Sequence, residues 1–260
     1  MQADPRSVIE RLEATASLPP GKEERFNGYG VMGLPFKSGH VLAMRRFWAS
    51  SVGSGYTSVW HRTSHGDWVF YANVDPRQSC TRYFGASASE AIETEIRLTW
   101  PAPFRLHFAM PALRFEWEIT LQATAATRVV NAAGRLLPNA AWQSPAVLAA
   151  MGKVAGTLLG AGRVGLHGRV PNGQHFIANP RELWAVADSR ARLAEEDFGP
   201  PGPCIRRPAW QTSGFPSGGY WRQVNRTSIR LIRHVTRQRR LVRCRDPDES
   251  GASRLRLTCV

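Results

Sequence analysis

Three stretches in the middle of the chain alternate between apolar and polar residues with a period of two. The stretches are Ile92–Trp100, Phe104–Phe108 and Arg114–Gln122, and, except at Thr94, each places aromatic or aliphatic side chains at every second position. Because successive side chains of a strand point to opposite faces, this pattern predicts strands with one apolar and one charged face. A sheet of such strands, joined by short connections, is antiparallel and has one face in water.

Shorter apolar runs extend the strand pattern on both sides of this region. The other predicted strands are His40–Trp48, Tyr56–Arg62, Asp67–Val74, Val164–Val170, Gln174–Asn179 and Leu183–Ala187. Two pairs of them form hairpins, because the turns Thr63–Gly66 and Pro171–Gly173 contain the glycine that hairpin loops favour.

Helical patterns occur in three places. Arg6–Ala16 has an apolar stripe that begins just after a proline, whereas Thr127–Leu137 and Ser144–Gly160 are rich in Ala and Leu. We therefore predict a mainly β protein, an antiparallel meander or partly closed barrel with a helical insert at about 127–160. Such an architecture can enclose an apolar ligand.

The glycine run Gly28–Gly33 matches the dinucleotide-binding pattern G-x-G-x-x-G letter for letter. That function requires a buried strand before the glycines and a helix after them. The preceding residues are mostly charged, and Pro35 follows almost at once, so we expect a glycine-rich loop and no nucleotide site.

Candidate site residues gather on the first predicted hairpin. Trp60, Trp68, Phe70 and Tyr71 could line a pocket for a hydrophobic ligand, and packing in the core explains them equally well. His61 and Tyr71 are the candidates for catalysis, because each could exchange a proton inside such a cavity.

No combination of residues in the sequence predicts a metal site or a cofactor. His61 and His65 are four residues apart but fall on a strand and a turn, so a third ligand is missing. Ser144–Gly162 barely reaches the length of a membrane-spanning helix and carries Lys153, so its glycines at 152, 156 and 160 predict a tightly packed helix in a water-soluble protein. The polar N-terminus favours a cytoplasmic protein.

Charge divides the chain into two parts. Residues 204–260 contain 13 Arg and three acidic residues, so they carry +10 of the formal charge of +14. We therefore predict a β-rich globular domain at 1–203 and a basic tail at 204–260. In the tail, Arg222, Arg226, Arg230, Arg233, Arg237 and Arg240 could share one helix face that binds nucleic acid or an anionic membrane surface.

The same tail has a second interpretation. The chain uses 31 Arg against 3 Lys, which is typical of a GC-rich gene, and a shifted reading frame in such a gene yields Arg, Pro, Gly and stray Cys. The tail is then a frameshifted or disordered segment, and binding to nucleic acid or membranes is expected only if it is genuine.

Four stretches between Phe26 and Leu193 resemble uncharacterised proteins of GC-rich actinobacteria: FNGYGVMGLPFKSGH, YTSVWHR, DWVFYANV and HGRVPNGQHFIANPRELWAV. The strand layout also resembles calycin-like barrels, such as lipocalins and the carotenoid-hydratase group. That resemblance implies a cavity for a lipid or isoprenoid-like molecule. It assigns no residue a role, and the helical insert departs from a plain lipocalin.

These observations leave three functions open. The first is binding of a small hydrophobic molecule in the barrel. The second is a hydratase or isomerase on the same scaffold, and the third is binding of nucleic acid or an anionic surface through the tail. Whether the protein is an enzyme, which ligand it binds and its oligomeric state stay open at this point.

Overall fold

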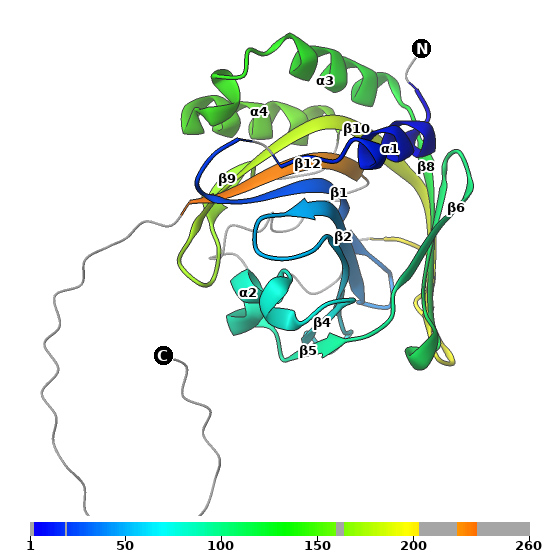
Figure 1. Cartoon of the computed structure of the whole chain (residues 1–260). Helices are drawn as coiled ribbons and strands as arrows, with labels where there is room; N and C mark the ends of the chain where they lie inside the picture. The colour runs from blue at the N-terminus through cyan, green and yellow to red at the C-terminus, as the bar shows by residue number, and fades with distance from the viewer. Residues whose placement is uncertain (1–2, 19, 160–163, 203–222, 233–260) are drawn as a thin grey trace, which may run out of the picture.

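The protein is mainly β, with one large sheet and a few helices (Figure 1). The computed structural model describes residues 3–18, 20–159 and 164–202, together with the backbone of 223–232. The strands are β1 (Glu24–Pro35), β2 (Val41–Ser50), β3 (Tyr56–Arg62), β4 (Trp68–Ala72), β5 (Glu90–Glu93), β6 (Arg97–Ala102), β7 (Arg105–Met110), β8 (Phe115–Gln122), β9 (His167–Arg169), β10 (His175–Leu193), β11 (Glu196–Asp197) and β12 (Gln223–Ile232). The α-helices are α1 (Pro5–Ala14), α2 (Thr81–Phe84), α3 (Ala125–Leu136) and α4 (Pro145–Leu158), and short 3-10 turns cover Pro76–Gln78, Gly85–Ser87, Pro111–Leu113 and Ala141–Gln143.

The strands follow the order β5-β4-β3-β2-β1-β12-β10-β8-β7-β6 across the sheet. Neighbouring strands are antiparallel, except that β4 and β5 are parallel. The sheet curves until its two halves face each other, but the outermost strands β5 and β6 do not pair (Figure 1). The prediction of a mainly β, partly closed structure is therefore confirmed, whereas the described strands do not close into a calycin-type barrel.

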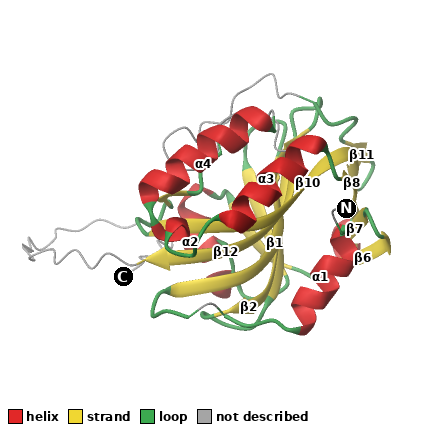
Figure 2. Ribbon diagram, turned by 90° about the horizontal axis from the view of Figure 1, so that it is seen from above, coloured by secondary structure: helices red, strands yellow, loops and turns green. Residues whose placement is uncertain are grey.

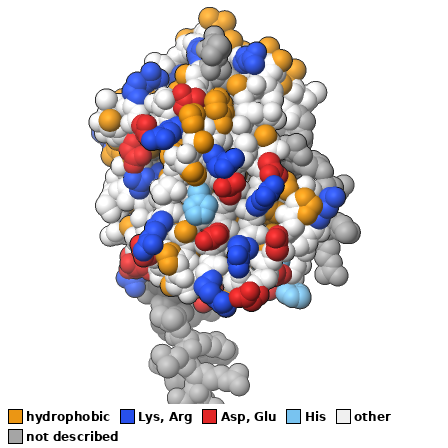
Figure 3. Space-filling model, turned by 90° about the vertical axis from the view of Figure 1, so that its right-hand side faces the viewer, with side chains coloured by type: hydrophobic (Ala, Val, Ile, Leu, Met, Phe, Trp, Pro, Cys, Tyr) orange, Lys and Arg blue, Asp and Glu red, His pale blue; other side chains and the backbone are white. Residues whose placement is uncertain are grey.

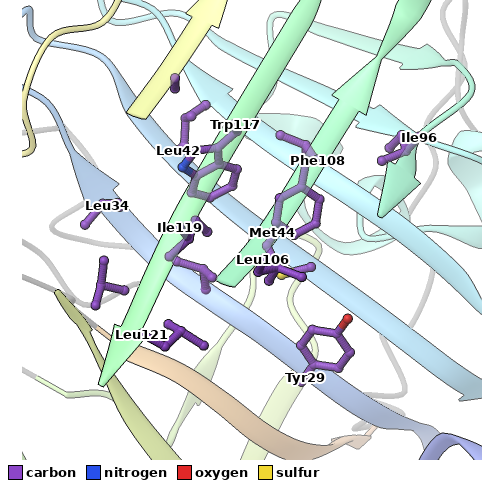
Figure 4. Close-up of a cluster of buried hydrophobic side chains, with 14 of the residues drawn as sticks. Tyr29, Leu34, Leu42, Met44, Ile96, Leu106, Phe108, Trp117, Ile119 and Leu121 are labelled. Carbon is purple, nitrogen blue, oxygen red and sulfur yellow. The ribbon is translucent and has the colours of Figure 1, made fainter. Parts of the chain in front are cut away.

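The main hydrophobic core lies on the concave side of this sheet. Leu42 and Met44 of β2 face Leu106, Phe108 and Trp117 of β7 and β8, as Figure 4 shows, and these side chains are almost completely buried. Helix α1 adds its apolar face to the same core, and the buried indole nitrogen of Trp117 donates a 2.8 Å hydrogen bond to Oγ of Ser189. The alternation in β8 thus places its rings inside, as the sequence predicts.

A second core lies on the opposite face of β2, β3 and β4. Its members are mainly aromatic: Phe26, Ala43, Phe47, Tyr56, Trp60, Phe70, Cys80, Tyr83 and Val170. Several of the rings meet edge to face, for example Phe26 and Tyr83 with their centroids 5.7 Å apart. Strands β2 and β3 are consequently buried on both faces, which explains why β3 lacks a polar alternation.

Many predicted elements agree closely with the structure. Strand β3 has the predicted bounds, and α1, α3 and α4 begin and end within two residues of the predictions. Helix α1 starts after Asp4, whose carboxylate accepts from the backbone N–H of Ser7, and α3 starts with a capping box between Thr124 and Thr127. The segment predicted as one strand at 92–100 is divided between β5 and β6, and the last two predicted strands are parts of the single strand β10.

The glycine run at 28–33 is not a loop but the middle of strand β1. It supports no nucleotide site, because the glycines lie inside an antiparallel ladder between β2 and β12. A Cβ atom on Gly28 would lie 2.0 Å from the carbonyl oxygen of Arg46. The glycine therefore serves a close approach of two strand backbones at a β-bulge.

Part of the basic tail belongs to the sheet. Residues 223–232 form β12, which pairs with β1 on one side and β10 on the other. The prediction of an Arg-bearing helix is therefore wrong at Arg226 and Arg230, which lie on this strand. The predicted positions Arg222, Arg233, Arg237 and Arg240 fall outside the described residues.

Helices α3 and α4 lie next to each other on the outer side of the sheet, over β10 (Figure 2). Gly152 and Gly156 are both buried on α4, and a Cβ at Gly152 would lie 2.2 Å from the carbonyl oxygen of Val164, as the prediction of a tightly packed helix requires. Gly160 falls outside the described residues. None of the described helices combines the length and the apolar character needed to cross a membrane.

Candidate functional site

Two histidines form a buried pair at one end of the main core. His40 lies just before β2, and His61 is on β3 opposite Leu42. Both side chains point to the concave face, and each residue is only 2% exposed. Nδ1 of His40 and Nε2 of His61 are 2.8 Å apart, which is hydrogen-bonding distance.

A carboxylate connects this pair to the surface. Oε1 of Glu196 on β11 lies 2.9 Å from Nε2 of His40, and the Glu196 side chain is 57% exposed. The ring of Phe198 stacks on His40 with centroids 4.0 Å apart and also stacks on His61 at 5.1 Å. A continuous polar chain therefore runs from solvent through Glu196 and His40 to His61, and an aromatic ring fixes both imidazoles.

The electrostatics of the site keep His61 neutral at physiological pH. Burial and, to a smaller extent, the neighbouring His40 together lower the pKa of His61 to about 4. A protonated imidazole loses more hydration on burial than a neutral one, which is the cause of the first effect.

The protonation state of His40 determines whether Nδ1 of His61 carries a proton or a lone pair. Glu196 accepts from Nε2 of His40. A neutral His40 then accepts from Nε2 of His61, so Nδ1 of His61 carries a lone pair. A doubly protonated His40 donates to Nε2 of His61 instead, and Nδ1 of His61 carries the proton. Nδ1 of His61 makes no hydrogen bond to any described residue, so it can act as donor or acceptor.

Tyr71 shares this face of the sheet. It pairs with Val59, two residues from His61, and its side chain packs in the main core. Burial raises the pKa of Tyr71, with a further contribution from Glu90, so its hydroxyl stays protonated. The two predicted catalytic candidates are thus both buried on the concave face, and their catalytic role stays a prediction.

The two unpaired edges of the sheet are formed by β5 and β6, and we call the place where these strands do not pair the open seam. Tyr71 lies next to one of these edge strands. Tyr71 on β4 pairs with Ile92 on β5, which is one outermost strand, and Leu98 belongs to β6, the other. Both Ile92 and Leu98 are only partly buried and pack against the main core. Ile92 thus lies beside Tyr71 on the neighbouring strand.

The four predicted ligand-contacting residues do not share one surface. Trp60, Trp68 and Phe70 belong to the second core, on the opposite face from Tyr71. The ring centroids of Trp60 and Phe70 are 4.8 Å apart, so these two rings pack directly on each other. The four side chains therefore cannot line a single pocket, because they lie on two faces of the sheet. Their contact with a ligand stays a prediction.

The second core contains a buried cation that the sequence did not indicate. One guanidinium nitrogen of Arg45 donates to the backbone oxygens of Val31 at 3.0 Å and of Met44 at 2.7 Å. The guanidinium also lies over the ring of Trp60, 5.1 Å from its centroid. Burial lowers the pKa of Arg45. The two backbone oxygens and the Trp60 ring thus stabilise the positive charge of the buried Arg45 guanidinium.

The Cys80 thiol in the same core lacks the features of a nucleophile. It is buried, and its sulfur lies 3.3 Å from the hydroxyl of Tyr56 and 3.6 Å from that of Ser58. Burial raises its pKa, although Tyr56 and Arg45 oppose that rise. Since the thiolate is the reactive form, a thiol held protonated in this way is inert.

Other charged groups on the described part of the chain are dispersed. His65 is exposed on the turn after β3, away from the buried His61. No group of three or more His, Cys, Asp or Glu side chains converges as metal ligands among the described residues. On β7 and β8, Arg105 lies 3.9 Å from Glu118, and Figure 3 shows basic and acidic side chains interspersed on that side of the molecule.

The histidine pair predicts a pH dependence of stability. His61 has a folded-state pKa of about 4 and an ordinary value of 6.5, so the unfolded chain binds a proton in this interval that the folded chain does not. The free energy of unfolding should therefore decrease as the pH falls from about 6.5 to about 4, by about 3 kcal/mol from this residue.

Urea unfolding at a series of pH values measures this effect. The variant His61→Gln should show a shallower loss of stability with acid than the wild type. The matched control is His65→Gln on the same hairpin, whose acid profile should equal that of the wild type. If the free energy of unfolding fell with pH equally in His61→Gln and in the wild type, that result would contradict a lowered pKa for His61.

Comparison with known proteins identifies no family. Neither a protein-family model nor a curated protein matches the sequence. A solved structure, the acetoacetate decarboxylase of Legionella pneumophila, aligns over 84% of this chain and 87% of that chain, with 9% identity and a TM-score of 0.37. We draw neither fold nor function from a likeness at that level.

Proposed function

We propose that the protein binds a small, mainly apolar molecule on the concave side of the sheet and exchanges a proton with it at His61. The observation that carries this proposal is the chain Glu196–His40–His61, which connects solvent to a neutral, buried imidazole. The ligand class is a lipid or isoprenoid-like molecule with one polar group, because the surroundings of His61 are otherwise apolar.

The proton transfer uses two states of the histidine pair. When His40 is doubly protonated, Nδ1 of His61 gives its proton to the ligand, Nε2 of His61 takes the proton from Nδ1 of His40, and His40 becomes neutral. When His40 is neutral, the reverse sequence removes a proton from the ligand, and Glu196 stabilises the imidazolium that forms. This is general acid and base chemistry of the kind that isomerases and hydratases use.

Tyr71 and the open seam support a route for the ligand. The hydroxyl of Tyr71 stays protonated and is a hydrogen-bond donor on the same face as His61. The partly buried side chains Ile92 and Leu98 offer apolar contacts where β5 and β6 fail to pair. Small movements of these side chains would admit a ligand without breaking strand pairs.

Fluorescence titration tests this proposal. The full-length chain is titrated with an environment-sensitive fluorescent fatty acid and, separately, with a dansyl-labelled isoprenoid alcohol. We expect saturable binding of at least one probe, and His61→Gln should weaken that binding by roughly tenfold through loss of one hydrogen bond to a buried group. His65→Gln should bind like the wild type. The absence of saturable binding for both probes would refute the proposal.

A further inference from the structure

Helix α3 packs against the sheet with its polar and small side chains. Thr127, Asn131 and Gly134 are its buried residues. The amide of Asn131 donates to the backbone oxygen of Leu183 at 3.0 Å and accepts from the backbone N–H of the same residue at 2.9 Å. These two hydrogen bonds fix the orientation of the helix, so the apolar side of α3 points away from the protein.

The exposed large hydrophobic side chains of the described residues all lie on α3 and α4. Val129 and Leu136 of α3 are 57% and 85% exposed, and Val154 and Leu158 of α4 are 58% and 48% exposed. We call these four residues the α3–α4 apolar face. At about 100° per residue, Val129 and Leu136 lie on the side of α3 opposite its buried residues. Helix α4 likewise buries Leu148 and two glycines and turns Val154 outward.

The two helices form one continuous surface. They contact each other and lie together on the outer side of the sheet, as Figures 1 and 2 show from two directions. Between the apolar residues, the outward positions are occupied mainly by alanine, as at Ala132, Ala133 and Ala150, all of which are exposed. The outward side of the two helices is thus mainly apolar.

The exposed charged side chains of α3 and α4 themselves have one sign. From 119 to 181 the sequence contains no Asp or Glu, whereas Arg128, Arg135 and Lys153 lie on α3 and α4 and are exposed. Arg135 also pairs with Glu182 of β10 at 2.7 Å, so Arg128 and Lys153 are the cations left for an external partner. Apolar side chains flanked by cations characterise helices that lie in the interface of an anionic membrane.

We propose that the α3–α4 apolar face docks on an anionic lipid bilayer, with both helices parallel to the membrane plane. Valine and leucine side chains would enter the boundary between headgroups and acyl chains, and the flanking cations would contact anionic headgroups. Self-association is disfavoured, because two copies of this face would bring cations together without any acidic residue on either helix. The proposal is independent of the site at His61 and of the Arg residues of the tail.

Co-sedimentation with sucrose-loaded vesicles tests the proposal on the full-length chain. The vesicles contain phosphatidylcholine either alone or mixed with phosphatidylglycerol. We expect binding to the mixed vesicles and much weaker binding to phosphatidylcholine alone. The fourfold variant Val129→Ser, Leu136→Ser, Val154→Ser, Leu158→Ser should lower the partition coefficient at least about tenfold. Removing two cations by Arg128→Gln and Lys153→Gln should lower it by roughly fivefold per charge.

A matched variant separates this face from general surface charge. Arg11→Gln with Arg77→Gln removes two exposed cations elsewhere and should leave the partition coefficient within about twofold of the wild-type value. If the fourfold variant folds and still partitions like the wild type, the face is not the docking surface. The proposal is equally refuted if the wild type does not bind the mixed vesicles, or if size-exclusion chromatography shows a dimer that the fourfold variant converts to a monomer.

Discussion

Deleting residues 204–260 is expected to abolish cooperative folding. The deletion removes β12, which is hydrogen-bonded to β1 through Glu24–Val31 and to β10 through His175–Ala185. Without it, both strands at the centre of the sheet lose a neighbour and expose unpaired backbone groups, which favours aggregation. We expect insoluble protein, or soluble protein without a cooperative thermal transition in circular dichroism.

A shorter deletion is the control for this prediction. Removing only residues 233–260 retains β12 and should give soluble protein that unfolds cooperatively near the wild-type temperature. If the chain ending at 203 unfolded with the same midpoint and cooperativity as the longer one, β12 would not be part of the fold. The reading-frame hypothesis for the tail stays a prediction, and resequencing the gene through the codons for 195–215 tests it.

The substitution Gly28→Ala is expected to destabilise the protein by about 3 kcal/mol or more. The added Cβ would lie 2.0 Å from the carbonyl oxygen of Arg46 and 2.7 Å from Cα of Phe47. Both atoms belong to the backbone of β2, so neither can move without disturbing the strand pair. Urea unfolding measures the change in the free energy of unfolding.

A substitution at another glycine is the control, because it should raise the free energy of unfolding. Gly134 lies in α3, where an added Cβ would lie 3.6 Å from the ring of Trp142, an ordinary contact distance. Because glycine is a weaker helix former than alanine, Gly134→Ala should stabilise the protein by up to about 1 kcal/mol. A Gly28→Ala variant as stable as the wild type would show that β1 and β2 do not approach each other as closely as described.

The sequence predicts the strands wherever burial on one face produces alternation. Phe115 and Trp117 occupy alternate positions of β8, and the structure buries both. Strand β1 escapes prediction for a physical reason. Its glycines are required by the close approach of β2, yet the same residues are typical of loops. Strand β12 escapes because arginines spaced three and four apart suggest a helix, whereas pairing on both sides makes it a strand.

The candidate site is only partly visible in the sequence. His61 can be identified as a candidate, but Glu196 is 156 residues from His40 and no spacing rule connects them. The fold brings them together because β11 turns back after β10 and places Phe198 against both histidines. Trp60 and Tyr71 illustrate the converse, since they are close in sequence but lie on opposite faces of the sheet.

The orientation of α3 also follows from contacts outside the helix. Its apolar residues alone would predict that Val129 and Leu136 face the sheet. Asn131 overrides that pattern, because its amide hydrogen-bonds both the backbone N–H and the backbone oxygen of Leu183. An amphipathic pattern therefore indicates that a helix has two faces, but the neighbouring backbone decides which of them is buried.

Nitrogen-15 NMR of the histidine rings, with and without the fluorescent fatty acid or the isoprenoid probe, tests the central claim most directly. The proposal predicts that His61 stays neutral down to a pH of about 4 and that a bound probe shifts the Nδ1 resonance of His61, while the ring resonances of His65 do not respond to the probe. A His61 ring that is protonated at neutral pH, or one whose resonances are unchanged at saturating concentrations of both probes, would contradict it.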